Sequence, residues 1–331
     1  MEIVFNVVAP VFAIIVAGWS AGRMGLLGRD GSKALNQFVY WFSLPAVLFL
    51  GLASAPMDDI FNLPFLMAFM SGLVIAYGIA LATGWVLYRR RASADGPAPD
   101  GTAGQKASMM ALNASFSNTG YMGIPLFIAL VGSSHLAPVI VATVIMSAVM
   151  VAVAIIMLEA LGPSDDPPLK VVLGIGRSLI TNPLIVSSAA GLLAAYFTIP
   201  IAEPIQRFGD LMGAAAGPCA LFAIGLFLAG QRLTDGLGDA LWISSLKLIL
   251  QPLITWLLID AFFPMDPYWR AAAIVLAALP TGALTFVMAE RYGVSVGDTS
   301  AAILISTLIS IITLSLILLS LAPVFQQVVA G

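Results

Sequence analysis

Ten long apolar stretches follow one another along the chain and constrain its fold more than any other feature. A helix needs about 20 residues to cross the roughly 30 Å hydrocarbon layer of a bilayer, and each stretch is long enough. The stretches lie at residues 3–22, 34–54, 63–88, 107–131, 137–161, 171–197, 209–230, 240–263, 269–290 and 299–325. Only 9% of the residues are charged, whereas soluble proteins have about 25%. The sequence therefore predicts an all-α polytopic membrane protein with ten transmembrane helices.

The positions of Lys and Arg predict how the chain is oriented in the membrane. Eleven basic residues fall in connections on one side, and two, Arg207 and Arg270, fall on the other. The eleven are Arg23, Arg29, Lys33, Arg89, Arg90, Arg91, Lys106, Lys170, Arg177, Arg232 and Arg291. Because cytoplasmic loops are enriched in Lys and Arg, we expect this side to be cytoplasmic. Both termini are then predicted to face outward, in a bacterial inner membrane.

An internal repeat divides the chain into two halves. Four residue pairs recur at one common spacing of 173 residues. They are Pro10 and Pro183, Gly18 and Gly191, Pro45 and Pro218, and Phe49 and Phe222. Each half has five spans, so the second must cross the membrane in the opposite direction, as in many secondary transporters. We predict two inverted repeats, residues 1–161 and 162–331, with a flexible cytoplasmic loop at residues 89–106.

Helix-breaking residues interrupt the fourth and ninth stretches. The fourth contains NTGYMGIPLF with Pro125, and the ninth contains Pro280. Proline removes a backbone donor and clashes with the carbonyl four residues earlier, so both helices are predicted to break and to cross at these prolines. Gly120, Gly123 and Gly282 are predicted to permit the close approach of the two backbones. The alternative is that the prolines only kink packed helices.

The two breaks predict a binding site for a small anion. Helix N-termini carry partial positive charge and free N–H groups, which suit a carboxylate. Polar side chains surround the first break, whereas the residues before Pro280 are almost all apolar. The predicted substrate-binding residues are Asn113, Asn118, Thr119, Tyr121, Pro125, Pro280, Thr281 and Lys247. No catalytic residue, metal ligand or cofactor is predicted.

Lys247 is the one basic residue well inside a predicted span. Ionisable groups at that depth are functional hypotheses, because a fixed cation can bind an anionic substrate or replace a coupling ion. The alternative is that its side chain reaches the cytoplasmic surface. The sequence contains no pair of adjacent mid-membrane acids, which disfavours a dedicated sodium/proton antiporter.

Other function classes are disfavoured by the sequence. The basic residues form no stripe with interleaved aromatic residues, so no nucleic-acid partner is predicted. The single Cys219 allows neither an intramolecular disulfide nor a Cys-based metal cluster. GLGD at residues 236–239 has the form of an intramembrane aspartyl protease motif, but no second mid-membrane Asp accompanies it, and one carboxylate cannot divide acid and base work. An enzyme is not predicted.

Four segments resemble the auxin efflux carrier family, which includes bacterial carriers and the plant PIN-FORMED auxin transporters. The segments are NQFVYWFSLPAVLF at 36–49, FSNTGYMGIPL at 116–126, TNPLIVSSAAGLL at 181–193 and LPTGALTFVMAERYG at 279–293. The resemblance implies two inverted sets of five spans, similar to bile acid symporters and sodium/proton antiporters. It also implies an elevator-like movement of a transport domain against a scaffold that often forms a homodimer. The connection GPSDDPPLK after the fifth span is short where plant members have a very long hydrophilic loop.

We therefore predict a secondary carrier that moves a small organic anion, a carboxylate, across the lipid bilayer by alternating access. Two alternatives stay open. One is a sodium-coupled organic anion symporter of the bile acid transporter type, and the other is a non-transporting ligand-binding membrane sensor with the same fold. The sequence leaves the substrate, the direction of transport and the coupling ion, H⁺ or Na⁺, undetermined.

Overall fold

A computed structural model describes residues 8–95, 100–162, 173–174, 176–177, 180–230 and 237–330. These residues are helical apart from short connections and one isolated β-bridge, which confirms the predicted all-α class. Lys170, Arg232 and Gly236, together with most of the GPSDDPPLK connection, lie outside the described residues.

Within the described residues, six helices are long and apolar enough to cross a membrane. They span Asp30–Ser54, Leu63–Ala94, Ala137–Ala160, Glu203–Ala229, Leu237–Phe262 and Val296–Val328, and they match the second, third, fifth, seventh, eighth and tenth predicted spans. The helices in the first and sixth predicted spans, α1 (Ala9–Arg23) and α11 (Pro183–Tyr196), are shorter. The fourth and ninth predicted spans are both interrupted.

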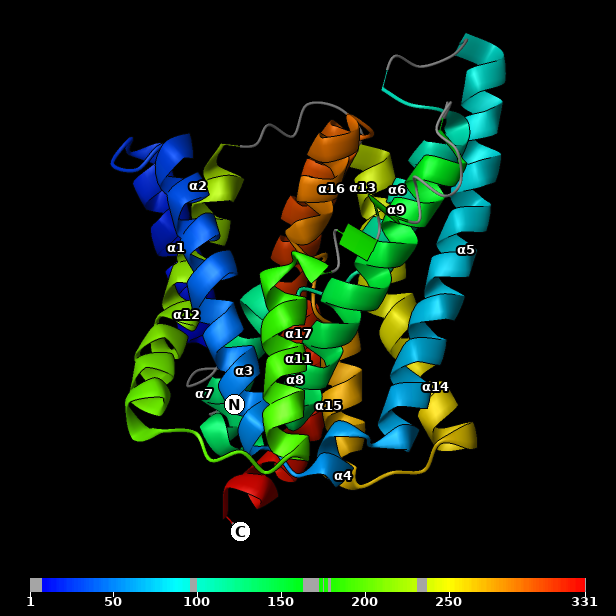
Figure 1. Ribbon diagram of the computed structural model, residues 1–331. Helices are drawn as coiled ribbons and strands as arrows, with labels where there is room; N and C mark the ends of the chain where they lie inside the picture. Colours follow the sequence, from blue (N-terminus) through cyan, green and yellow to red (C-terminus); the bar gives the residue numbers. More distant parts are fainter. Residues whose placement is uncertain are drawn as a thin grey trace.

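The helices pack into two groups (Figure 1). The first bundle consists of α1, α2 (Arg29–Phe38), η2 (Val39–Ser43), α3 (Leu44–Ser54), α11 and α12 (Glu203–Ala229), in which α1 packs along α12 and α11 along α3. The second bundle consists of α5 (Leu63–Asp95), α6 (Ala103–Ser115), η3 (Thr119–Gly123), α7 (Ile124–Val131), α8 (Ala137–Val144), η5 (Ile145–Met150), α9 (Val151–Ala160), α13 (Leu237–Ser245), η6 (Leu246–Leu250), α14 (Gln251–Phe262), α15 (Pro267–Ala277), α16 (Leu284–Tyr292) and α17 (Val296–Ala330). Each bundle therefore combines helices from both predicted repeats.

Glycines allow the closest contacts within the first bundle. A Cβ added to Gly18 on α1 would lie 2.2 Å from the carbonyl oxygen of Phe222 on α12. A Cβ added to Gly191 on α11 would lie 2.5 Å from the carbonyl oxygen of Phe49 on α3. Small residues at such contacts let helix backbones approach closely in a membrane. Gly18 and Gly191 form one of the recurring pairs, and Phe49 and Phe222 form another. Each contact therefore joins a glycine of one predicted repeat to a phenylalanine of the other.

Three wide π-helical turns come just before prolines. The turn η2 ends two residues before Pro45, η3 two residues before Pro125, and η6 two residues before Pro252. A π-turn adds a residue to the helical turn, so the chain can pass a proline with a local adjustment of its hydrogen bonds. These three prolines consequently lie within continuous helical segments.

The connection between α5 and α6 is shorter than the predicted loop at residues 89–106. The helix α5 continues to Asp95, and α6 begins at Ala103 behind a capping box formed by Thr102 and Gln105. On α5, Arg91 forms two hydrogen bonds with Asp239 of α13, at 2.5 and 2.9 Å. This ion pair joins the end of α5 beyond the apolar stretch to Asp239 of the GLGD segment.

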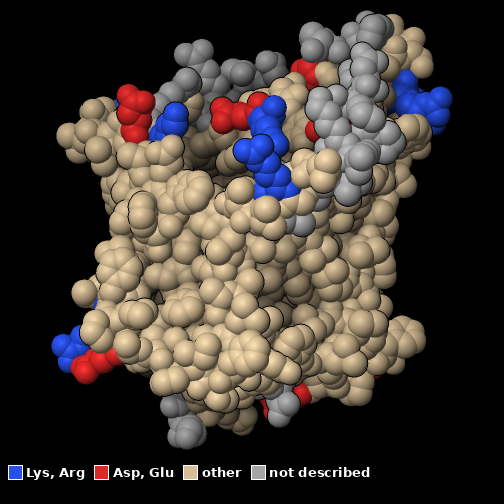
Figure 2. Space-filling view, in the orientation of Figure 1, with Lys and Arg blue, Asp and Glu red and all other residues tan. Residues whose placement is uncertain are grey.

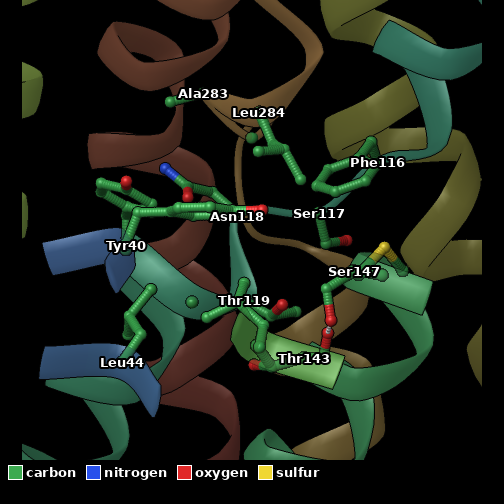
Figure 3. Close-up of a pocket in the computed structure, with 15 residues that line it drawn as sticks. Tyr40, Leu44, Phe116, Ser117, Asn118, Thr119, Thr143, Ser147, Ala283 and Leu284 are labelled. Carbon is green, nitrogen blue, oxygen red and sulfur yellow. Dashed lines mark hydrogen bonds between the residues drawn. The ribbon is translucent and has the colours of Figure 1, made fainter. Parts of the chain in front are cut away.

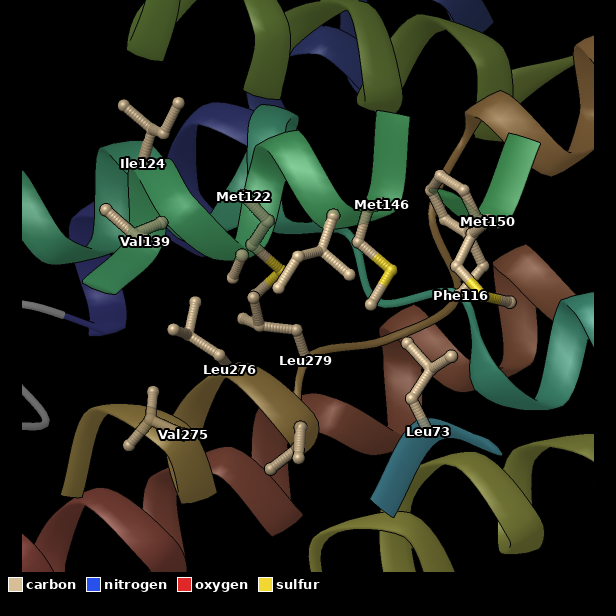
Figure 4. Packing of buried hydrophobic residues seen from close by; sticks show 14 of the residues in the cluster. Leu73, Phe116, Met122, Ile124, Val139, Met146, Met150, Val275, Leu276 and Leu279 are labelled. Atoms are coloured by element: carbon tan, nitrogen blue, oxygen red, sulfur yellow. The ribbon is translucent and has the colours of Figure 1, made fainter. Parts of the chain in front are cut away.

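Charged side chains gather at the two ends of the molecule. On the face in Figure 2, the described residues leave a wide band without Lys, Arg, Asp or Glu between these ends. Such a band matches the hydrocarbon layer of a bilayer. Inside the second bundle, Met122 and Met146 on one side and Leu276 and Leu279 on the other fill the space beside the interrupted helices (Figure 4).

Candidate functional site

Two interrupted helices cross in the interior of the second bundle. The chain leaves α6 after Ser115 and re-enters helical structure in η3 at Thr119. It leaves α15 after Ala277 and re-enters in α16 at Leu284. Irregular backbone at this depth needs hydrogen-bond partners from protein, since lipid offers none.

The two interruptions supply each other's hydrogen-bond partners. The amide of Asn118 donates to the carbonyl oxygen of Pro280 at 3.0 Å, and the amide of Gly282 donates to the carbonyl oxygen of Phe116 at 2.9 Å. Ser117 and Thr281 form an antiparallel β-bridge between these bonds. The crossing therefore lies at Ser117 and Thr281, next to Pro280.

The prediction that Pro125 lies at the crossing is wrong. Pro125 is the second residue of α7, eight residues after Ser117, and it faces α12, where a Cβ on Gly217 would lie 3.4 Å from its Cβ. The wide turn η3 accommodates this proline, so its missing N–H causes no break. Pro280, in contrast, lies inside the second interruption, as predicted.

A small pocket lies between the crossing and the first bundle (Figure 3). Asn118, Thr119, Gly120 and Tyr121 line it from one broken helix, and Gly282 to Leu284 line it from the other. Tyr40, Leu44 and Leu184 close it from the first bundle, and Thr143 and Ser147 from the fifth span. Its volume is about 30 Å³. We call it the crossing pocket.

Unpaired hydrogen-bonding groups line the crossing pocket. The side chains of Asn118 and Thr119 make no hydrogen bond to another described residue. The backbone amides of Gly120, Tyr121, Ala283 and Leu284 likewise have no acceptor within the described part of the chain. These amides lie at the N-terminal ends of η3 and α16, where helix dipoles add partial positive charge. The pocket is therefore suited to an anion with hydrogen-bond acceptors.

The carbonyl ends of the broken helices are capped by the eighth predicted span. Lys247 on η6 donates from Nζ to the carbonyl oxygen of Ala277, the last residue of α15, at 2.7 Å. Gln251 on α14 donates from Nε2 to the carbonyl oxygen of Ser115, the last residue of α6, at 3.1 Å. Both side chains are buried, so the alternative that Lys247 reaches the cytoplasmic surface is wrong. Donors there offset the partial negative charge of helix C-termini.

Asn113 and Thr281 support the crossing from behind. The amide nitrogen of the Asn113 side chain donates to the hydroxyl of Thr299 on α17, at 2.9 Å. The hydroxyl of Thr281 donates to the carbonyl oxygen of Asn113, and the amide of Thr281 donates to the hydroxyl of Ser306. Both residues are fully buried and do not line the crossing pocket.

The structure brings only part of the predicted site together. Of the predicted substrate-binding residues, Asn118, Thr119 and Tyr121 line the crossing pocket, whereas Asn113, Pro125, Pro280, Thr281 and Lys247 do not. Of the predicted crossing residues, Gly120 and Gly282 line it. Gly123 instead packs beside Leu279, whose Cδ1 would lie 3.0 Å from an added Cβ.

The pocket residues outside the broken helices were not predicted from the sequence. Tyr40 lies in the NQFVYWFSLPAVLF segment but was not assigned to the site. Thr143 and Ser147 stand four residues apart in an otherwise apolar span, and the hydroxyl of Ser147 donates to the carbonyl oxygen of Thr143. A polar pair at helical spacing in such a span is a signal that could have identified this wall of the pocket.

A larger pocket adjoins the crossing pocket. Its volume is about 270 Å³, and it shares Tyr40 and Leu284 with the crossing pocket. The remaining lining residues are Trp41, Val151, Ile155, Thr181, Asn182, Pro183, Val287, Met288 and Arg291. We call this space the vestibule. Like the crossing pocket, it lies between the two bundles.

The sequence is similar to a known protein family and to several known proteins. The family described as "Membrane transport protein" matches residues 3–318. A protein named "Putative malonate transporter" from Rhizobium meliloti (strain 1021) is 30% identical over 315 residues, 95% of each chain. The uncharacterized transporter YfdV of Escherichia coli K12 is 22% identical over 308 residues, 92% of this chain and 93% of that protein. Auxin efflux carrier component 3 of Arabidopsis thaliana is 30% identical over 164 residues, 46% of this chain and 26% of its own.

Proposed function

The chain belongs to the membrane transport protein family, as its resemblance to the auxin efflux carriers predicted, and on that premise we propose that it is a secondary carrier of a small organic anion. The observation that carries the proposal is the crossing pocket. It combines two helix N-termini with unpaired amides and the free side chains of Asn118 and Thr119. Fixed donors of this kind favour a carboxylate over a cation or a neutral solute.

The substrate we propose is a small carboxylate, and malonate is the first to test. The name of the relative from Rhizobium meliloti supports a dicarboxylate. The crossing pocket is small, which favours a compact acid over a bulky one.

The mechanism we propose is elevator-like alternating access. The first bundle would serve as the scaffold, and the second bundle would carry the crossing pocket along it. Both pockets lie between the bundles, so a displacement of one bundle would move the site relative to the wall formed by Tyr40, Leu44 and Leu184. The underlying ten spans in two inverted repeats are supported by the exchanged contacts of Gly18 with Phe222 and Gly191 with Phe49.

We further propose that transport does not require Na⁺. The carbonyl ends of the broken helices are the sites in the crossing with negative potential, and a coupling cation would be stabilised there. Lys247 and Gln251 already donate hydrogen bonds to these carbonyls. This arrangement favours an anion carrier over the sodium-coupled symporter of the bile acid transporter type.

Uptake into proteoliposomes tests the proposed function. The purified protein would be given labelled malonate, other dicarboxylates, monocarboxylates and indole acids, each in sodium and in choline buffers and with and without a pH gradient. We expect saturable uptake of a small carboxylate at equal rates in both buffers. Uptake only in sodium would support the symporter, and a ligand that stabilises the protein without being taken up would support a sensor.

A further inference from the structure

The vestibule contains one charged group. Arg291, in the last turn of α16, is the only charged residue among the described residues that line either pocket. Its side chain is exposed, and no carboxylate in the described part of the chain forms an ion pair with it. Its guanidinium lies over the ring of Tyr292, 5.8 Å from the centroid. An arginine without an acidic partner is available to bind an anion.

The position of Arg291 is fixed by its neighbours in the chain. The helix α16 ends at Gly293, which adopts the left-handed conformation with φ 65°. The hydroxyl of Tyr292 donates to Oε1 of Glu159 on α9, at 3.0 Å. These contacts hold the end of α16 against α9, so the guanidinium is presented from an anchored backbone.

The surroundings of Arg291 strengthen its attraction for an anion. Val151, Ile155, Val287 and Met288 form apolar walls in the vestibule. A charge beside low-dielectric walls acts over a longer range than one that faces open water. A guanidinium also matches a carboxylate geometrically, because it can donate two parallel hydrogen bonds to it.

The vestibule and the crossing pocket differ in volume. The crossing pocket has about 30 Å³ and the vestibule about 270 Å³. In this conformation the vestibule is the larger of the two, and it adjoins the crossing pocket at Tyr40 and Leu284. Arg291 also belongs to the basic residues that are predicted to be cytoplasmic.

We propose that the vestibule is a loading site in which Arg291 binds a carboxylate group of the substrate on the cytoplasmic side, before the anion enters the crossing pocket. This inference rests on the proposed function, since it assumes that a carboxylate is transported. In this proposal Arg291 sets the affinity for substrate that arrives from the cytoplasmic side, and the crossing pocket carries the substrate across the membrane.

The test is the KM for labelled malonate, or for the best carboxylate of the uptake panel, in inside-out and right-side-out membrane vesicles. Each KM would be measured at ionic strengths of about 0.01 and 0.15 M, where the Debye length falls from roughly 30 to 8 Å. In inside-out vesicles Arg291→Gln should raise the KM roughly 10-fold at low salt, the value of one lost charge-assisted contact. The maximal rate should stay unchanged, and the salt dependence of the KM should largely disappear.

Two variants serve as controls. Arg291→Lys keeps the charge but loses the planar fork, so its KM should lie between those of the wild type and Arg291→Gln. Arg23→Gln removes an arginine that also lies over an aromatic ring, Trp19, at 5.6 Å, and that is also predicted to be cytoplasmic. It lines neither pocket and should leave the KM unchanged.

Three results would overturn the loading site. The first is a KM of Arg291→Gln equal to that of the wild type. The second is a rise in the KM of Arg23→Gln as large as that of Arg291→Gln. The third is a rise in the KM of Arg291→Gln that is as large in right-side-out vesicles as in inside-out vesicles. If the wild-type protein takes up no carboxylate at all, the proposed function fails and the loading site with it. Uptake with an unaltered KM in Arg291→Gln overturns the loading site alone.

Discussion

The amide of Gly282 donates a hydrogen bond to the carbonyl oxygen of Phe116 at 2.9 Å and so joins the two broken helices. An added Cβ at position 282 would lie 2.7 Å from Cδ1 of Phe116 and 3.4 Å from Cα of Asn118. The crossing therefore depends on the absence of a side chain at this position.

Gly282→Ala should disrupt the crossing. The methyl group must displace the ring of Phe116 or separate the two backbones, and overpacking of this kind costs about 1–3 kcal/mol. We expect a lower midpoint of thermal unfolding and a loss of uptake. The control is Gly78→Ala on α5, where an added Cβ meets nothing within 4 Å. Equal behaviour of the two variants would show that the crossing tolerates a side chain.

Gly18→Ala should destabilise the first bundle. The new Cβ would lie 2.2 Å from the carbonyl oxygen of Phe222, which is backbone and cannot rotate away, so α1 and α12 must move apart. Gly191→Ala should have a similar effect on α11 and α3, because its contact with Phe49 is equivalent. Thermal unfolding in detergent measures both. A stable Gly18→Ala protein would contradict the close packing of α1 on α12.

Asn113→Ala should reduce stability more than affinity. The substitution removes the hydrogen bond to Thr299 and leaves that hydroxyl buried without its partner, which costs about 1–3 kcal/mol. Because Asn113 does not line the crossing pocket, the folded variant should keep the wild-type KM. Thermal unfolding and concentration-dependent uptake test the two parts. A raised KM at unchanged stability would return Asn113 to the binding site.

The parts of the fold that follow from local chemistry were predicted well. The apolar stretches that form continuous spans and the interruption at Pro280 were both visible in the sequence. The break at Pro125 was predicted by the same reasoning and is wrong. Within the described residues, a π-turn precedes Pro125 and none precedes Pro280, and the sequence pattern around the two prolines did not distinguish these cases.

The candidate site was only half predictable because it is assembled from helices that are distant in the sequence. Asn118 and Thr119 were identified because they are polar residues next to a helix break. Tyr40 and Leu184 contribute through the packing of the first bundle against the crossing, which no local pattern reports. Lys247 was identified as unusual, but its partner, the carbonyl oxygen of Ala277, became evident only in three dimensions.

Asn118 provides the most direct test of the central claim, which is that a small carboxylate is transported through the crossing pocket. Its side chain lines the pocket and has no hydrogen-bond partner among the described residues, so Asn118→Ala removes a substrate contact without removing a structural one. The measurement is carboxylate uptake by proteoliposomes containing the wild type or Asn118→Ala, matched for protein content and thermal stability. We predict that the variant loses uptake at least 10-fold, about 1.4 kcal/mol, while it unfolds at the wild-type temperature. Normal uptake by the folded variant would contradict a transport site at the crossing.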